Sequence, residues 1–220
     1  MKIKHQRGIY SKSILYIILA ALAAGSGLWA AQNWFHKPQA QSTKLMQTVR
    51  LFPEVRELPD FALQSSDKKI INKAAINKHW TLVFLGFTHC PDVSPTTLGD
   101  LSKAQKVWET LPAETRPRVL FVSIDPERDT PKIIAEYAAF FHKDTLTATL
   151  QEPALANFVQ SLALVYAKMP MKNGDYTMDH SATIVVLNPQ GNEVGIIRPP
   201  LMPQKIAADL IALSNNKQDK

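Results

Sequence analysis

The chain contains a single cysteine, Cys90, and its position constrains the fold more than any other sequence feature. Residues 80–87 before it are apolar at successive positions, which is typical of a strand buried on both faces. Ser94 and Pro95 after it resemble an N-cap and first-turn pair, which predicts a helix over residues 94–111. A thiol at such a junction lies at the positive end of the helix dipole, which favours the thiolate. We therefore expect chemistry at Cys90, and no disulfide within the chain.

The net positive charge of the chain lies in its N-terminal part. Residues 1–50 contain seven of the 25 Lys and Arg residues and no acidic residue, which leaves 18 basic and 19 acidic residues in 51–220. Residues 51–220 therefore carry no excess positive charge and lack the basic bias that usually accompanies binding to a phosphate backbone. We therefore expect no nucleic-acid partner.

Residues 14–31 form an uncharged, mostly apolar run preceded by four basic residues. Its length is near the lower limit for a membrane span, and the basic flank predicts that residues 1–12 stay cytoplasmic. The alternative is a cleaved signal peptide, but the small-residue pattern that cleavage prefers is poor at the end of the run. We predict one transmembrane anchor at residues 13–31. It would place a single-pass protein in the inner (cytoplasmic) membrane, with its globular domain on the periplasmic side.

The rest of the chain predicts a linker at residues 32–57, one globular domain at 58–214 and a polar tail at 215–220. Within the domain, apolar strands alternate with helices that have apolar residues at helical spacing. This order predicts an α/β fold with a central mixed β-sheet and helices on both faces. The expected strands are a short hairpin within 58–71, then 80–87, 119–124, 165–171, 181–187 and 193–197; the expected helices are 94–111, 131–141, 153–164 and 206–213.

Three separate segments carry a family resemblance. They are Gly-Phe-Thr-His-Cys-Pro-Asp at 86–92, Val-Ser-Ile-Asp-Pro-Glu-Arg-Asp-Thr-Pro at 122–131 and Tyr-Thr-Met-Asp-His-Ser at 176–181. In this order they resemble the Sco/SenC family, and the resemblance extends from about residue 58 to 213. It implies a thioredoxin-like domain, tethered to a membrane, that handles copper during the assembly of respiratory oxidases such as cytochrome c oxidase.

The resemblance also implies a metal site made by a C-x-x-x-C pair and a distant histidine, which fall at Cys90 and His180. Ser94 occupies the second cysteine position, and a hydroxyl is a poor ligand for Cu(I), which prefers thiolate, thioether and imidazole donors. We predict that Cys90 and His180 bind a copper ion, with Ser94 and Met178 as further candidate ligands. Met178 is included because a residue two positions from His180 on an extended chain points to the same side.

Several of these residues also have purely structural interpretations. Ser94 fits an N-cap that needs no other role, and Met178 fits core packing or an exposed hairpin. Asp125, Arg128 and Asp129 precede a predicted helix, so we expect them to cap and tie it.

Three functions remain open from the sequence. The first is a membrane-anchored copper-binding protein that resembles oxidase assembly factors. The second is a thiol-disulfide redox protein in which Cys90 is the catalytic residue and an external thiol resolves the mixed disulfide. The third is a docking protein with a degraded metal site, whose partner is a respiratory oxidase subunit or a dithiol relative.

Overall fold

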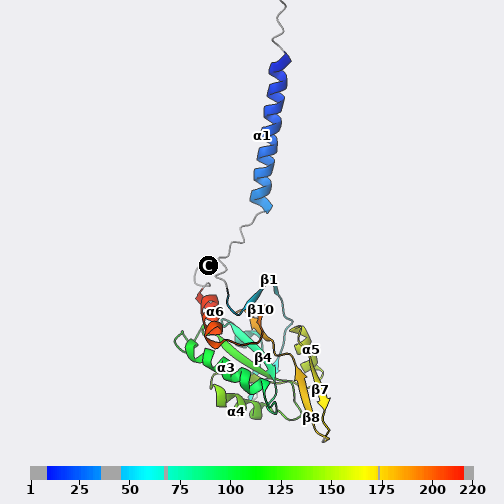
Figure 1. The fold of residues 1–220 in the computed structure, drawn as a ribbon, viewed down its shortest axis with the longest axis vertical. Helices are drawn as coiled ribbons and strands as arrows, with labels where there is room; N and C mark the ends of the chain where they lie inside the picture. The colour runs from blue at the N-terminus through cyan, green and yellow to red at the C-terminus, as the bar shows by residue number, and fades with distance from the viewer. Residues whose placement is uncertain (1–8, 36–45, 67–68, 173, 216–220) are drawn as a thin grey trace, which may run out of the picture. The chain divides into compact units, whose positions relative to one another are not determined.

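The computed structural model describes residues 9–35, 46–66, 69–172 and 174–215. Contacts divide the chain into two units, residues 1–44 and 45–220, which we describe separately (Figure 1). Most of the predicted basic segment and almost all of the polar tail lie outside the described residues.

The first unit contains one helix, α1 (Ile9–Phe35), of 27 residues. The described side chains of residues 14–27 and of Trp29 are exposed. Within the described ranges, no helix has the length and apolar character needed to cross a membrane. Residues 13–31, which the sequence predicts as a transmembrane anchor, all lie within α1.

The second unit is built on a six-stranded sheet with the strand order β1-β10-β9-β4-β5-β6. The central strand β4 pairs in parallel with β5 and antiparallel with β9, so the sheet is mixed, as predicted. Two further two-stranded sheets are formed by β2 with β3 and by β7 with β8. The strands are β1 (Arg50–Arg56), β2 (Leu63–Gln64), β3 (Ile70–Ile71), β4 (Thr81–Gly86), β5 (Arg118–Ser123), β6 (Leu146–Ala148), β7 (Tyr166–Pro170), β8 (Tyr176–His180), β9 (Ile184–Leu187) and β10 (Glu193–Ile197).

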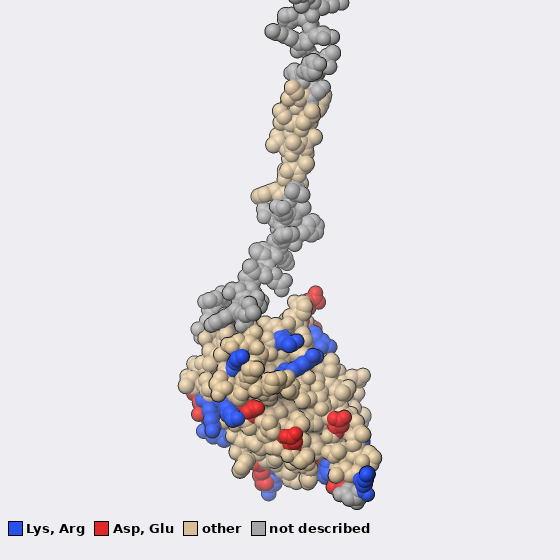
Figure 2. Space-filling view, viewed as in Figure 1, with Lys and Arg blue, Asp and Glu red and all other residues tan. Residues whose placement is uncertain are grey.

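Helices cover both faces of this sheet, because alternate residues of each central strand point to opposite sides. Leu82 and Phe84 of β4 pack in one apolar cluster with residues of α3, α4 and α6. Val83 and Leu85 pack in a second cluster with residues of α2, α5 and β8. The helices are α2 (Lys73–Ile76), α3 (Val93–Trp108), α4 (Pro131–Phe141), α5 (Ala154–Ser161) and α6 (Pro203–Asn215). On the face of this unit seen in Figure 2, basic and acidic side chains are interspersed.

The predicted linker is wrong over part of its length. Residues 50–56 form β1, which pairs antiparallel with β10 at the edge of the sheet. The buried carboxylate of Asp209 on α6 accepts hydrogen bonds from the backbone N–H groups of Gln47, Thr48 and Val49 at 2.7 to 3.0 Å. These bonds fix the segment that leads into β1, so the packed unit starts before residue 58.

Candidate metal centre

Cys90 lies between the end of β4 and the start of α3, as predicted. Its N–H donates to the carbonyl of Phe87 at 3.2 Å, and its sulfur accepts the N–H of Ser94 at 3.4 Å. Ser94 belongs to the first turn of α3, whose N–H groups have no partner within the helix. The thiol is free, partly exposed and packed against the second apolar cluster. The helix start therefore directs a hydrogen-bond donor at the sulfur.

Ser94 is not the N-cap of this helix, contrary to the sequence interpretation. α3 begins at Val93 with Asp92 at the N-cap position, and the Asp92 side chain makes no capping bond. The Ser94 side chain is fully buried, and its oxygen accepts the N–H of Phe87 at 3.3 Å. Its hydroxyl therefore supports the loop that carries Cys90.

His180 ends β8 and packs edge-on against two aromatic rings, with its centroid 6.1 Å from both Phe84 and Phe87. Its Nδ1 lies 3.1 Å from the carbonyl oxygen of Ser181. A carbonyl can only accept, so Nδ1 carries the hydrogen and Nε2 keeps its electron pair when the ring is neutral. Burial lowers the pKa of His180, although the Ser181 carbonyl and the charge of Asp179 act in the opposite direction. The neutral ring, which is the form that binds metals, is therefore favoured.

Phe87 is a common neighbour of both predicted ligands, through its carbonyl with Cys90 and through its ring with His180. The fold thus brings residues 90 positions apart into one region, next to the end of β4. Met178, the further candidate, is buried in the apolar cluster that contains Phe87. Its burial agrees with the structural interpretation, core packing.

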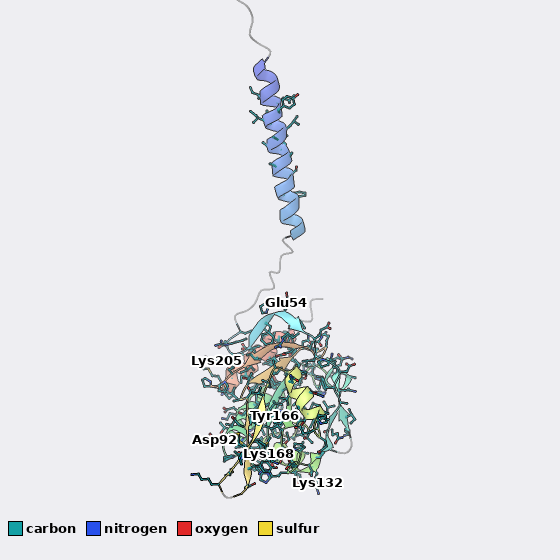
Figure 3. All side chains as sticks on the ribbon, turned by 90° about the vertical axis from the view of Figure 1, so that its right-hand side faces the viewer. Glu54, Asp92, Lys132, Tyr166, Lys168 and Lys205 are labelled. Atoms are coloured by element: carbon teal, nitrogen blue, oxygen red, sulfur yellow. The ribbon has the colours of Figure 1, made fainter. Side chains whose placement is uncertain are left out.

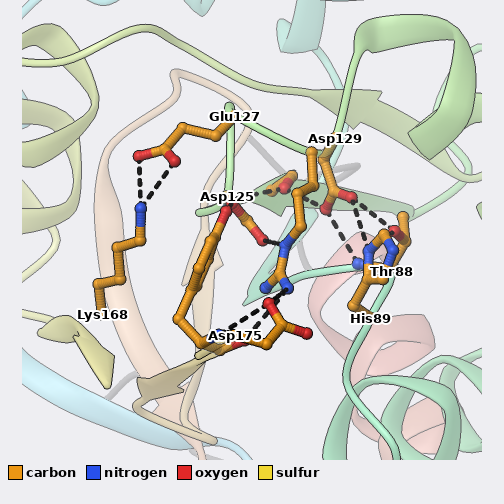
Figure 4. A network of polar contacts seen from close by, with 10 residues as sticks. Thr88, His89, Asp125, Glu127, Asp129, Lys168 and Asp175 are labelled. Atoms are coloured by element: carbon orange, nitrogen blue, oxygen red, sulfur yellow. Dashed lines mark hydrogen bonds and ion pairs between the residues drawn. The ribbon is translucent and has the colours of Figure 1, made fainter. Parts of the chain in front are cut away.

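Asp125, Arg128 and Asp129 make other contacts than the predicted helix cap. The N-cap of α4 is Thr130, whose hydroxyl accepts the N–H of Ile133 at 3.3 Å. Asp129 instead contacts the loop before Cys90, and Asp125 and Arg128 contact β8 (Figure 4). Parallel pairing of β4 with β5 is the feature that could have predicted the contact between residues 125–129 and the Cys90 loop, because loops that follow adjacent parallel strands meet at one edge of the sheet.

Sequence reasoning did not single out Tyr137 on α4. Its hydroxyl oxygen is buried without a hydrogen-bond partner. Burial, and then the negative charges of Cys90 and Asp129, raise the pKa of Tyr137 to about 12. The phenol therefore stays neutral beside this region at neutral pH.

A separate cluster of potential ligands lies away from Cys90. Atoms of Glu109, His142 and Asp144 lie within 4.8 Å of one another. The backbone N–H of Asp144 donates to Nδ1 of His142 at 3.2 Å, so the ring hydrogen is on Nε2, which faces Glu109 at 3.3 Å. Nε2 has no free electron pair in this arrangement, and hydrogen bonding within the cluster explains it without a metal.

Comparisons with known proteins agree with this architecture. The SCO1/SenC family model matches residues 53–215. A protein of Stutzerimonas stutzeri that is named for copper binding is 32% identical over 155 residues, which cover 70% of this chain and 74% of that protein. The mitochondrial SCO2 homolog of Bos taurus is 30% identical over 175 residues, covering 79% of this chain and 66% of its own length.

Solved structures give the same result. The structure of Bradyrhizobium japonicum ScoI with copper bound aligns with a TM-score of 0.64 at 32% identity, covering 70% of this chain and 98% of that one. The second unit is therefore a thioredoxin-like α/β domain with its thiol at a strand-to-helix junction. The chain belongs to the SCO1/SenC family.

Proposed function

We propose that this protein binds one copper ion through the Cys90 thiolate and Nε2 of His180. The observation that carries the proposal is that both residues contact Phe87, Cys90 through its backbone N–H and His180 through its ring, with a donor atom of each left free for a metal. A thiolate and a neutral imidazole are soft and borderline donors, which suit copper. The copper named in the S. stutzeri relative and in the B. japonicum structure supports the same ligand.

The copper ion is cargo in this proposal, and the recipient is a copper site of a respiratory oxidase such as cytochrome c oxidase. Transfer requires a site that retains copper and also releases it. Two protein donors retain Cu(I) less strongly than two thiolates and an imidazole would, which favours release to a partner. Membership of the family supports this role. A redox role for Cys90 is less favoured, because a single thiol has no resolving partner in the chain.

We also propose that α1 attaches the domain to a membrane, with residues 45–220 on the periplasmic side. The uncharged run at 14–31, its exposed apolar side chains and the basic residues before it support this arrangement. Deletion of residues 1–31 should move the protein from the membrane fraction to the soluble fraction after carbonate extraction. A full-length protein that is itself extracted by carbonate would contradict the anchor.

The copper proposal is tested by anaerobic Cu(I) titration of the full chain in detergent against a chromophoric chelator. We expect one retained equivalent, and a loss of affinity of at least about tenfold in Cys90→Ala and in His180→Gln. His36→Gln is the matched control, because it removes an imidazole that precedes the domain. The absence of retained copper, or equal affinity in Cys90→Ala, would reject the proposal.

A further inference from the structure

The loop between β5 and α4, residues 125–129, contacts both segments that carry the proposed ligands (Figure 4). We call it the bracket loop. Its last residue, Asp129, is fully buried and accepts hydrogen bonds from the N–H of Thr88 at 2.9 Å, the hydroxyl of Thr88 at 2.5 Å and the hydroxyl of Ser123 at 2.6 Å. Thr88 lies two positions before Cys90. Asp129 therefore fixes the segment that leads to the thiol.

The other end of the bracket loop holds β8, the strand that ends at His180. Asp125 accepts hydrogen bonds from the Tyr176 hydroxyl at 2.8 Å and from Nε of Arg128 at 2.6 Å. The Arg128 guanidinium lies 3.8 Å from the centre of the Tyr176 ring and donates to the Tyr176 carbonyl at 3.1 Å. Arg128 thus joins Asp125 to both the ring and the backbone of the first residue of β8.

Glu127 adds a third contact, an ion pair with Lys168 of β7 at 2.7 Å. Lys168 and Tyr166 project from β7 on the face turned to the viewer in Figure 3. Both partners of this ion pair are substantially exposed, and exposed pairs contribute little to stability. The partly buried Arg128 and the buried Asp125 are therefore the stronger link.

The hairpin formed by β7 and β8 depends on such side-chain contacts for its position. In the part of the chain that the structure describes, these strands form their own sheet and do not pair with the six-stranded sheet. An isolated two-stranded hairpin is at best marginally stable in water. Packing of Met178 and Tyr176 on the second apolar cluster and the contacts of the bracket loop therefore hold it.

We propose that the bracket loop sets the separation of Cys90 and His180, and that Arg128 is the positioning residue that holds the histidine strand against it. The inference rests on the proposed copper function and extends it to residues that do not touch the metal. Copper affinity depends on how closely the two donors are held before binding, because any ordering of the hairpin on binding lowers the net affinity.

The test compares Arg128→Met, Arg128→Lys and Tyr176→Phe with the original chain. Lysine keeps the charge but has no planar guanidinium that can bond Asp125 and the Tyr176 carbonyl at the same time. Arg128→Lys should therefore preserve the position of the hairpin and the copper affinity only in part. Tyr176→Phe removes the hydroxyl, which donates to Asp125 and also interacts with Glu127 of the bracket loop, and this variant remains informative if Arg128→Met does not fold. Lys132→Met on α4 is the matched control, because its side chain is 85% exposed and its ion pair with Glu136 is long, at 3.9 Å.

Two measurements are made on each full-length variant. Hydrogen exchange of the copper-free protein should rise about tenfold at residues 166–180 in Arg128→Met and stay unchanged in β4 and β5. Cu(I) affinity should fall about tenfold, with smaller losses in Arg128→Lys and Tyr176→Phe and none in Lys132→Met. A purely structural role would instead accelerate exchange throughout the domain.

Unchanged or uniformly faster exchange in Arg128→Met and in Tyr176→Phe would overturn the inference. A loosened hairpin with unchanged copper affinity would overturn the positioning role. If the original chain retains no copper, the proposed function fails, and the exchange measurement still decides whether the bracket loop holds the hairpin.

Discussion

Ser94 is the residue at which this chain departs from the two-thiol site that its family resemblance implies. Ser94→Cys should increase the Cu(I) affinity by on the order of tenfold or more, because a thiolate replaces a hard oxygen four positions from Cys90. The chelator titration described above measures this change. Ser94→Ala is the control: it removes the oxygen that is bonded to the Phe87 N–H without supplying a thiolate, so it should not increase the affinity. Equal affinity in the cysteine variant would show that residue 94 cannot reach the metal.

Gly86 has a steric role directly beneath the Cys90 loop. A Cβ at this position would lie 2.6 Å from Oγ of Ser94 and 2.8 Å from the Phe121 ring, both of which are buried. Gly86→Ala should therefore destabilise the domain by about 1 to 3 kcal/mol, measured by denaturant unfolding. Gly99→Ala is the matched control: nothing lies within 4 Å of its Cβ position on α3, so it should stabilise by up to about 1 kcal/mol. Equal effects would contradict the steric explanation.

At the scale of elements, Asp209 joins α6 to the segment before β1. Asp209→Ala should cost about 3 kcal/mol, because three backbone N–H groups lose a charged acceptor. Denaturant unfolding gives the loss, and limited proteolysis should show earlier cleavage before β1. Glu136→Ala, which removes an exposed carboxylate 3.9 Å from Lys132, should change stability by less than about 0.5 kcal/mol. A loss below about 1 kcal/mol in Asp209→Ala would show that β1 is held by its strand pairing alone.

The elements that sequence reasoning predicted well are those with strong local signals. β4 and β5 are almost completely buried, and α4 covers the predicted residues 131–141. β1 was mistaken for a linker because it is an edge strand: its side chains are mostly exposed, and Pro53 is tolerated where no ladder bond is needed. The three-residue β6 is too short to give a periodic pattern.

The candidate site was predictable in part from residue chemistry and in part from the family resemblance. Cys90 could be chosen from its chemistry and position and His180 only from the resemblance, and the structure places both beside Phe87. The contacts of the bracket loop could not be chosen in the same way, because Asp125 and Arg128 also suit a helix start. Only the pairing of strands distant in sequence shows that they face Tyr176.

At the scale of the whole molecule, the site lies where the carboxyl ends of β4 and β5 meet the separate hairpin. The sheet holds the Cys90 side of the candidate site rigidly, since β4 and β5 pair over six residues and are buried on both faces. The hairpin that carries His180 is attached by side chains and is the less constrained side. A copper carrier needs both properties, because retention favours a fixed pair of donors and release favours a donor that can withdraw.

The pH dependence of the domain's stability should contain a contribution from Glu193. This carboxylate on β10 is buried and lies 3.3 Å from Arg56 without hydrogen-bond geometry. Burial raises the pKa of Glu193, and the charge of Arg56 only partly opposes the shift. Between the ordinary and the raised pKa the folded state binds more protons than the unfolded state, so this contribution to stability falls as the pH rises through that window.

Glu193→Gln removes the buried charge and should therefore stabilise the domain near neutral pH. We expect a gain on the order of 1 kcal/mol at about pH 7, or a thermal midpoint about 2 to 4 °C higher, and almost no difference below about pH 4. Thermal unfolding of both proteins across this pH range measures the effect. Glu54→Gln, which changes an exposed carboxylate on β1, is the control and should leave the profile unchanged. A variant less stable than the original at neutral pH would mean that the Arg56 ion pair outweighs the cost of burying the charge.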